Sequence, residues 1–266
     1  MSNERVNELH QQACDRGEER YRDPDTGYLV FTALALEKRG YCCSSGCRHC
    51  PYKEAQDFAA EQARWLTDAR PEPGKASVLL FWSGGKDSFL AYRALAREEK
   101  RQIVLVNTFD AGSGMIAHQD IHSDVVAEQA AHLGVPAIGV PLHPARDYIE
   151  HVLLALDLLD NCEALAFGDL HLEHIREWRL STFGGEERTS KLSLLFPIWK
   201  VPYEELMQDL QNSHAACHVS AVAKEGLHIS IGDKFDETLV SRLPDDADKF
   251  GENGEFHTKV VFDPVE

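Results

Sequence analysis

The chain has 266 residues, of which 43% are hydrophobic, and its formal net charge is −17. That apolar fraction is typical of a globular protein with a buried core, and no run approaches the ~18 apolar residues that a membrane span needs. The negative charge would repel a polyanion at long range, so we expect neither a nucleic-acid partner nor a membrane. The N-terminal segment is polar and acidic and has no apolar core, which predicts a cytoplasmic protein without a signal peptide.

Residues 1–70 are expected to form a small cysteine-rich module. Four of the seven cysteines of the chain lie close together, namely Cys42, Cys43, Cys47 and Cys50. The C-x-x-C spacing of Cys47 and Cys50 lets two thiolates bind one metal ion, and His49 is a further candidate ligand. We therefore predict a zinc ion or an iron–sulfur cluster at these four cysteines. The competing interpretation is a group of reduced thiols without a metal.

The rest of this region carries a local basic patch and an expected helix. The patch consists of Lys38, Arg39, Arg48 and Lys53. It is the first place to look for a nucleic acid, should one bind. Residues 53–70 have apolar side chains at roughly helical spacing, which predicts a helix. Two prolines and a glycine in residues 70–75 then indicate a linker.

From residue 76 onwards the pattern predicts strands that alternate with helices. The expected strands are residues 77–82, 103–106, 136–140 and 164–169, and the expected helices are residues 87–100 and 123–134. Strand–helix alternation of this kind predicts an α/β fold, a doubly wound parallel sheet, over residues 76–170. Residues 171–266 mix a helical stretch after residue 202 with alternating segments near residues 217–231. They are expected to form a C-terminal α+β region that binds the substrate.

A glycine-rich hexapeptide, Ser83-Gly84-Gly85-Lys86-Asp87-Ser88, follows the first expected strand and precedes the first helix. An open parallel sheet binds ligands at this position, and two glycines let backbone N–H groups approach a phosphate. Asp87 follows Lys86 where a Walker loop has Ser or Thr, so Asp87 is a candidate partner for Mg²⁺. We predict that all six residues bind ATP. The competing interpretation is a glycine turn in which Ser83 or Asp87 caps the helix.

This hexapeptide resembles the signature of the pyrophosphatase-loop ATPases, also called the adenine nucleotide alpha-hydrolase superfamily. Within that superfamily the chain resembles the diphthine–ammonia ligase family, over residues 78–264. The supporting motifs are Gly168-Asp169 with Glu173, His174 and Arg176 after it, then Phe196-Pro197-Ile198-Trp199, and finally Gly251-Glu252-Asn253-Gly254-Glu255-Phe256-His257-Thr258. The cysteine-rich module is not part of the usual core of that family.

The resemblance implies a carbon–nitrogen ligase that converts a carboxylate to an acyl-adenylate, releases pyrophosphate and forms an amide with ammonia. It implies that the hexapeptide holds the triphosphate and Mg²⁺, with Lys86 and Asp87 in catalysis. The residues implied for the acceptor or the amine are Asp169, Glu173, Arg176, Glu252, Asn253, Glu255 and His257. His257 is also a candidate general base, because the pKa of histidine lies near neutrality. Its competing interpretation is a hydrogen-bonded structural histidine.

The nitrogen source is expected to be ammonia itself, free or from a partner, because the sequence shows no G-x-C-x-G elbow for a glutaminase. The acceptor is a carboxylate on a small molecule or on a protein side chain, and a homo-oligomer stays open. Two alternatives compete with the ligase. One is a thiolation-type tRNA-modifying enzyme whose clustered cysteines carry sulfur. The other is a sensor or scaffold that binds ATP without turnover.

Overall fold

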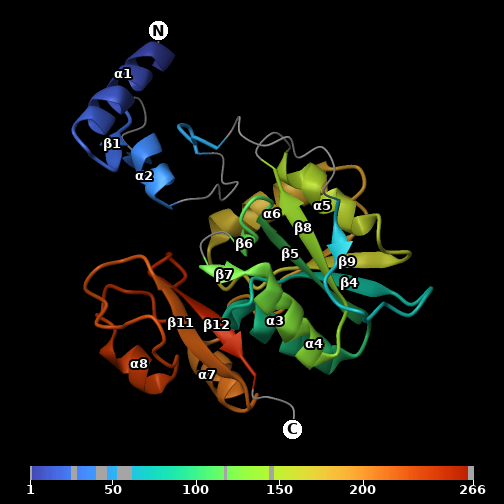
Figure 1. Cartoon of the computed structure of the whole chain (residues 1–266). Coiled ribbons are helices and arrows are strands. Elements are labelled where there is room, and N and C mark those ends of the chain that lie inside the picture. The colour runs from blue at the N-terminus through green and yellow to red at the C-terminus, as the bar shows by residue number, and fades with distance from the viewer. Residues whose placement is uncertain are drawn as a thin grey trace.

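The computed structural model of the chain describes residues 2–24, 29–39, 47–52, 62–116, 119–143 and 147–262. Within these ranges the central sheet has six strands in the order β10-β9-β4-β5-β8-β3 (Figure 1). Their bounds are β3 Arg64–Trp65, β4 Ser77–Phe81, β5 Gln102–Asp110, β8 Ala137–Leu142, β9 Cys162–Ala166 and β10 Ser193–Leu195. All neighbouring pairs are parallel except β3 with β8. The predicted α/β fold with a parallel sheet is confirmed.

Helices cover both faces of this sheet. One face carries α3 (Lys86–Glu98), α4 (Ser123–Leu133) and α7 (Tyr203–Gln211), and the other carries α5 (Tyr148–Leu156) and α6 (Glu173–Gly185). Successive residues of β4 face opposite sides, so Val78 and Leu80 belong to the first core and Leu79 packs with Val152 and Phe183 in the second. A strand buried on both faces is apolar throughout, which explains why β4 could be recognised in the sequence.

The C-terminal region packs against the first face as a two-stranded antiparallel sheet. This sheet pairs β11 (Ala216–Val222) with β12 (Phe256–Val261), and α8 (Glu237–Arg242) lies between the two strands in the sequence. Figure 1 shows β12 beside α3, where the two elements are in contact. A short hairpin of β6 (Met115–Ile116) and β7 (Ile121–His122) follows β5. The last strand of the chain therefore reaches the start of the first helix of the sheet domain.

The N-terminal elements lie apart from the sheet in Figure 1. They are α1 (Ser2–Asp15), β1 (Arg20–Arg22), β2 (Leu29–Phe31) and α2 (Ala33–Arg39), with β1 and β2 antiparallel. The rings of His10 and His49 stack at 3.7 Å, and the hydroxyl of Tyr21 lies 2.8 Å from Nε2 of His49. The buried carboxylate of Asp23 pairs with Arg48 at 2.6 Å. These contacts tie residues 47–50 to the first helix.

The helix expected over residues 53–70 is wrong where the structure describes it, and residues 53–61 lie outside the described residues. Arg64 and Trp65 form strand β3 and pair with Gly139 and Ile138 at the edge of the sheet. The backbone N–H of Leu66 continues the pairing with the carbonyl of Ala137 at 2.8 Å. The free edge of β8 supplies hydrogen-bond partners that a helical pattern in the sequence does not reveal.

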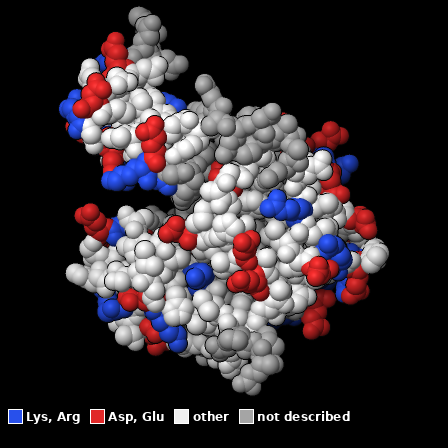
Figure 2. Space-filling model, viewed as in Figure 1, with Lys and Arg blue, Asp and Glu red and all other residues white. Residues whose placement is uncertain are grey.

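The surface view in Figure 2 shows acidic and basic side chains interspersed over the face in view. In the part of the chain that the structure describes, no helix combines the length and the apolar character of a membrane span.

Leu165 and Leu180 form a matched pair for testing the position of the core. Leu165 in β9 is 0% exposed, whereas Leu180 in α6 is 44% exposed. We expect Leu165→Ala to lower the free energy of unfolding by about 2–5 kcal/mol, because it leaves a cavity between sheet and helices. Leu180→Ala should change it by less than about 0.5 kcal/mol. Urea unfolding measures both, and equal losses would contradict this fold.

Candidate nucleotide-binding site

Ser83, Gly84 and Gly85 of the hexapeptide lie in the connection between β4 and α3, and Lys86, Asp87 and Ser88 form the first turn of α3. Gly84 has a φ of 81°, in the left-handed region that favours glycine. A Cβ atom on Gly85 would lie 2.9 Å from the carbonyl oxygen of Thr258 on β12. The conformation of the loop therefore requires the first glycine, and its close approach to β12 requires the second.

Hydrogen bonds from Gln129 and Val260 hold this loop in place. The carbonyl of Gly84 accepts from the backbone N–H of Val260 at 2.9 Å and from Nε2 of Gln129 at 3.0 Å. The same Nε2 donates to the carbonyl of Val260 at 2.8 Å, and Oε1 of Gln129 accepts from the indole N–H of Trp82 at 2.8 Å. The buried side chain of Gln129 thus joins β4, the loop and β12.

The start of α3 is capped from β12 and not from the hexapeptide. Gly85 is the N-cap residue and has no side chain to cap the helix, and Oγ1 of Thr258 accepts from the backbone N–H of Lys86 at 3.1 Å. Ser83 Oγ accepts from Gly85 N at 3.3 Å, and Ser88 Oγ donates to Gly85 O at 3.0 Å. Neither Ser83 nor Asp87 is therefore the N-cap residue that the competing interpretation expected. The N-terminal end of a helix still favours an anion, because its dipole has its positive end there.

Lys86 and Asp87 form an ion pair beneath the loop. Nζ of Lys86 lies 2.9 Å from Oδ2 of Asp87, and the lysine side chain is only 3% exposed. The ammonium also lies 5.3–5.8 Å from three aromatic ring centroids, those of Phe235, Phe250 and Phe256. Burial raises the pKa of Asp87 against the opposing effect of Lys86. The positive charge predicted for the phosphates is thus already engaged with a carboxylate and aromatic faces.

Two further carboxylates stand close to this pair, in the segment that precedes β12. Burial, and secondly the charge of Asp87, raise the pKa of Glu252 to about 8. Asp248 accepts from the N–H of Glu252 at 3.2 Å and from the hydroxyl of Tyr203 at 2.8 Å. Oδ1 of Asp87 is buried and has no hydrogen-bond partner within the described structure. Carboxylate oxygens are ligands that Mg²⁺ prefers, but no group of three or more His, Cys, Asp or Glu among the described residues could hold a metal ion by itself, so a bound Mg²⁺ would need further ligands from the nucleotide.

The loop borders a cavity of about 340 Å³. Its walls come from the carboxyl ends of β4, β5 and β9, from α5 and α6, and from residues 251–258. The predicted site residues that line it are Ser83, Gly85, Lys86, Asp87, Ser88, Asp169, Glu252 and His257. Segments far apart in the sequence thus meet at one edge of the sheet, as expected for an open parallel fold.

Other predicted residues lie elsewhere in the described structure. Glu173 is exposed and pairs with Lys200, and the guanidinium of Arg176 lies 5.0 Å from the ring of Trp199. Arg179, one helical turn after Arg176, is the arginine that reaches the cavity, where it pairs with Asp169 at 3.1 Å. Arg179 was not among the predicted site residues. The only signal in the sequence is an arginine on the helix after Asp169, and Arg176 fits that description equally well.

Glu255 and Asn253 do not line the cavity, but they stabilise the turn beside it. The buried carboxylate of Glu255 accepts from the backbone N–H of Asp248 at 2.9 Å and of Asn253 at 3.0 Å. It thereby holds the turn that presents Glu252. His257, in contrast, lies in the wall on β12, with Nδ1 3.4 Å from Nε2 of Gln119. Its predicted role as a base has a suitable location.

Only two of the four cysteines of the predicted metal site lie within the described residues. Cys50 N donates to Cys47 O at 3.3 Å, which forms a tight turn, while Cys42 and Cys43 lie outside the described residues. Over the ranges that the structure covers, no cluster of three or more His, Cys, Asp or Glu could hold a metal ion. The zinc or iron–sulfur site stays a prediction from the sequence.

Comparisons with known proteins match two parts of the chain. Residues 75–182, which include the loop, match the family model described as the diphthamide synthase N-terminal domain. Residues 9–56, which include the clustered cysteines, match a family of unknown function, DUF5522. A crystal structure described as a predicted subunit of tRNA methyltransferase from Methanocaldococcus jannaschii is 18% identical, with a TM-score of 0.38. That match covers 70% of this chain and 97% of the other chain.

Gly85 offers a direct test of the loop. Gly85→Ala would place a Cβ atom 2.9 Å from the carbonyl oxygen of Thr258, so the loop must shift away from β12. We expect Mg·ATP binding, measured by calorimetry, to weaken by about 10-fold or more, which corresponds to a loss of about 1.4 kcal/mol. Gly185→Ala at the end of α6 is the control, because its Cβ meets nothing within 4 Å. Equal affinities for the two variants would contradict the assignment of the loop.

The metal prediction for the module can be tested by elemental analysis. We expect about one zinc ion or one iron–sulfur cluster per chain in protein purified without oxygen or chelator. A double variant, Cys47→Ser with Cys50→Ser, should lose it, whereas Cys162→Ser in the sheet should retain it. Metal-free wild-type protein, or equal metal contents in both variants, would refute this prediction.

Proposed function

We infer the function of this chain from one premise, that the match of residues 75–182 to the diphthamide synthase N-terminal domain indicates an ATP-using enzyme. We propose that the chain is an AMP-forming ligase that joins a carboxylate to ammonia. The observation that carries this proposal is the glycine loop, which ends at the N-terminus of α3 on the carboxyl edge of a parallel sheet. Backbone N–H groups arranged in this way suit the pyrophosphate portion of ATP.

The proposed reaction has two steps. An oxygen of the acceptor carboxylate attacks the α-phosphorus of ATP, the bond to the bridging oxygen of the β-phosphate breaks, and pyrophosphate leaves. Ammonia then attacks the carbonyl carbon of the acyl-adenylate, AMP leaves, and an amide forms with loss of one proton. The loop residues Ser83–Ser88 would stabilise the leaving pyrophosphate, since most of the catalysis lies in positioning and in neutralising charge.

Mg²⁺ would be held by Asp87 and Glu252 together with phosphate oxygens, since both residues line the cavity and Oδ1 of Asp87 is buried without a partner in the described structure. The ion would supply charge neutralisation for the triphosphate. Arg179 is our candidate for binding the acceptor carboxylate, because a guanidinium can bind a carboxylate through two parallel hydrogen bonds. Its present partner is Asp169, at 3.1 Å. His257 is our candidate for the group that takes the proton lost by ammonia.

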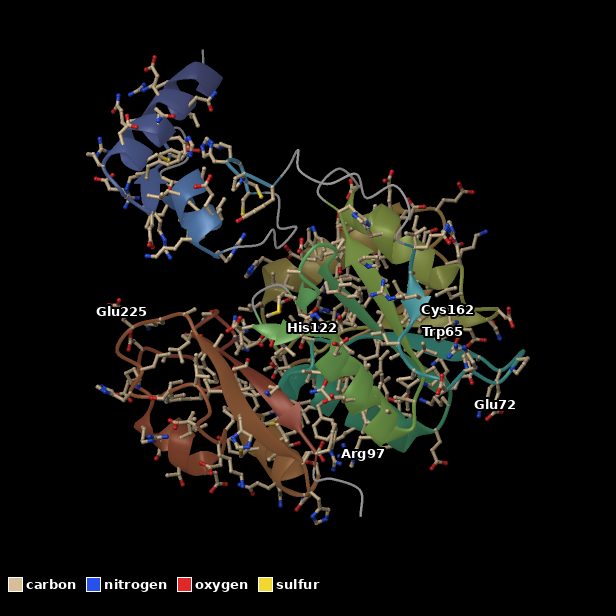
Figure 3. All side chains as sticks on the ribbon, in the orientation of Figure 1. Trp65, Glu72, Arg97, His122, Cys162 and Glu225 are labelled. Atoms are coloured by element: carbon tan, nitrogen blue, oxygen red, sulfur yellow. The ribbon has the colours of Figure 1, made fainter. Side chains whose placement is uncertain are left out.

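The described cysteines of the sheet and the C-terminal region do not suit sulfur transfer, so a thiolation reaction would depend on the clustered cysteines of the N-terminal module. Cys162 opens β9 at the amino edge of the sheet, opposite the loop, and Figure 3 marks its side chain there. Burial raises its pKa to about 11 and that of Cys217 to about 12. Sulfur carriers react as thiolates, so neither thiol suits that role near neutral pH. The other alternative, a sensor, would bind ATP without turnover.

Products labelled from the terminal phosphate of ATP separate these possibilities. With Mg²⁺, ammonium and a panel of carboxylates, we expect labelled pyrophosphate that depends on one acceptor. Asp87→Asn keeps the size of the side chain but removes its charge, and should reduce the rate by about 100-fold or more. Asp157→Asn is the matched control, since Asp157 is exposed and pairs with Arg188 on the surface.

Labelled orthophosphate would contradict cleavage between the α- and β-phosphates. ATP binding without turnover across the whole panel would favour the sensor. A rate that is equal in both asparagine variants would remove Asp87 from the proposed site.

A further inference from the structure

Three buried acceptor oxygens without hydrogen-bond partners in the described structure belong to residues that line the same cavity. They are Oδ1 of Asp87, Oδ1 of Asn107 and Oε1 of Gln119. Leaving a buried polar group unpaired costs about 1–3 kcal/mol, so such groups at a cavity indicate a ligand that supplies donors or a cation. Asp87 belongs to the proposed cation site, and Gln119 neighbours His257. Asn107 has no role in the chemistry proposed above.

The orientation of the Asn107 amide is determined by its neighbour. Asn107 lies near the carboxyl end of β5, its residue is 1% exposed, and its Nδ2 lies 2.8 Å from the backbone carbonyl of Trp82. A carbonyl oxygen can only accept, so the nitrogen of the amide must face Trp82. The oxygen is then the atom of this side chain without a hydrogen-bond partner in the described structure. A ligand group that pairs with it must supply a donor.

The surroundings of Asn107 indicate which part of a nucleotide would meet this acceptor. Val106, the neighbour of Asn107 on β5, lines the cavity with apolar atoms, and so do Ile116 and Phe81. None of the five Asp, Glu, Lys and Arg residues in the lining comes from β5; they are Lys86, Asp87, Asp169, Arg179 and Glu252. A flat, largely apolar base fits beside such apolar residues better than a ribose or a phosphate does.

We propose that Oδ1 of Asn107 accepts a hydrogen bond from the exocyclic amino group of adenine, and that Asn107 selects the base of the nucleotide. This inference rests on the proposed function, because it takes ATP as the occupant of the cavity. Adenine carries an amino group at carbon 6, whereas guanine and hypoxanthine carry a carbonyl there. Either of those bases would set an acceptor against an acceptor and leave both buried oxygens unpaired. ATP is favoured for that reason.

The test compares Mg·ATP, Mg·ITP and Mg·2′-deoxyATP binding to the full chain by calorimetry. The variants are Asn107→Leu, of similar size but without hydrogen-bonding atoms, and Asn161→Leu as a control outside the cavity. We expect wild-type protein and the control to bind ATP at least about 10-fold more tightly than ITP. In Asn107→Leu the ATP affinity should fall while that of ITP changes little, so that the ratio approaches about 1.

A second measurement needs no variant, in case Asn107→Leu does not fold. Wild-type protein should bind the triphosphate of purine riboside, which lacks any group at carbon 6, about 10-fold or more weakly than ATP. Equal affinities would overturn the inference.

The outcomes also separate this inference from the proposed function. Tight ATP binding with an unchanged preference over ITP in Asn107→Leu overturns the role of Asn107 and leaves the ligase intact. If Asn107→Leu loses the preference for ATP over 2′-deoxyATP but keeps the preference for ATP over ITP, the oxygen of Asn107 binds the ribose. That result also overturns the inference. Absence of nucleotide binding to wild-type protein would refute the proposed function itself.

Discussion

The carbonyl oxygen of Gly84 accepts two hydrogen bonds, from Gln129 on α4 and from Val260 on β12, and the architecture of the candidate site depends on them. A glycine loop alone has many conformations, because glycine loses the most backbone freedom on folding. Here the loop is held from both sides, by a buried amide and by the last strand of the chain. The same strand carries His257 and follows the turn that presents Glu252. The phosphate-binding loop and the proposed acceptor wall are therefore one connected unit.

Electrostatics explain how an acidic protein would bind an anionic nucleotide. The chain carries a net charge of −17, yet the loop ends at the positive end of a helix dipole. Asp87 and Glu252 add negative charge beside it, and burial raises the pKa of both groups. A divalent cation would lower these pKa values and neutralise part of the triphosphate. The site therefore suits the magnesium complex of ATP better than free ATP.

The sequence was informative wherever a structural feature is local. Strand β4, the loop and the start of α3 follow one another in the chain, so their residue types show both the fold and the phosphate site. Gln129, Asn107 and Arg179 were missed because each acts through a partner on another element. An isolated glutamine, asparagine or arginine in a sequence carries no sign of such a partner. The edge strand at Trp65 was read as a helix for the same reason, since only β8 gives it a pairing partner.

The sequence could not distinguish residues of the 251–258 motif that line the cavity from residues that stabilise its turn. Glu252 and Glu255 are both acids beside glycines in one motif. Glu252 lines the cavity, whereas Glu255 is buried and binds the backbone N–H groups of its own turn. The two glutamates are three residues apart, yet the carboxylate of Glu252 is available to a ligand and that of Glu255 stabilises the turn. That distinction depends on where the turn folds back, which is a property of the tertiary structure.

A crystal structure with Mg²⁺ and α,β-methylene-ATP, which resists cleavage between its first two phosphates, would test the central claim most directly. The account predicts the β- and γ-phosphates against the backbone N–H groups of residues 84–88, with the metal ion beside Asp87. The α-phosphorus would then face the cavity wall that contains Arg179 and Glu252. A triphosphate bound elsewhere on the chain, or a loop that stays empty at saturating nucleotide, would contradict it.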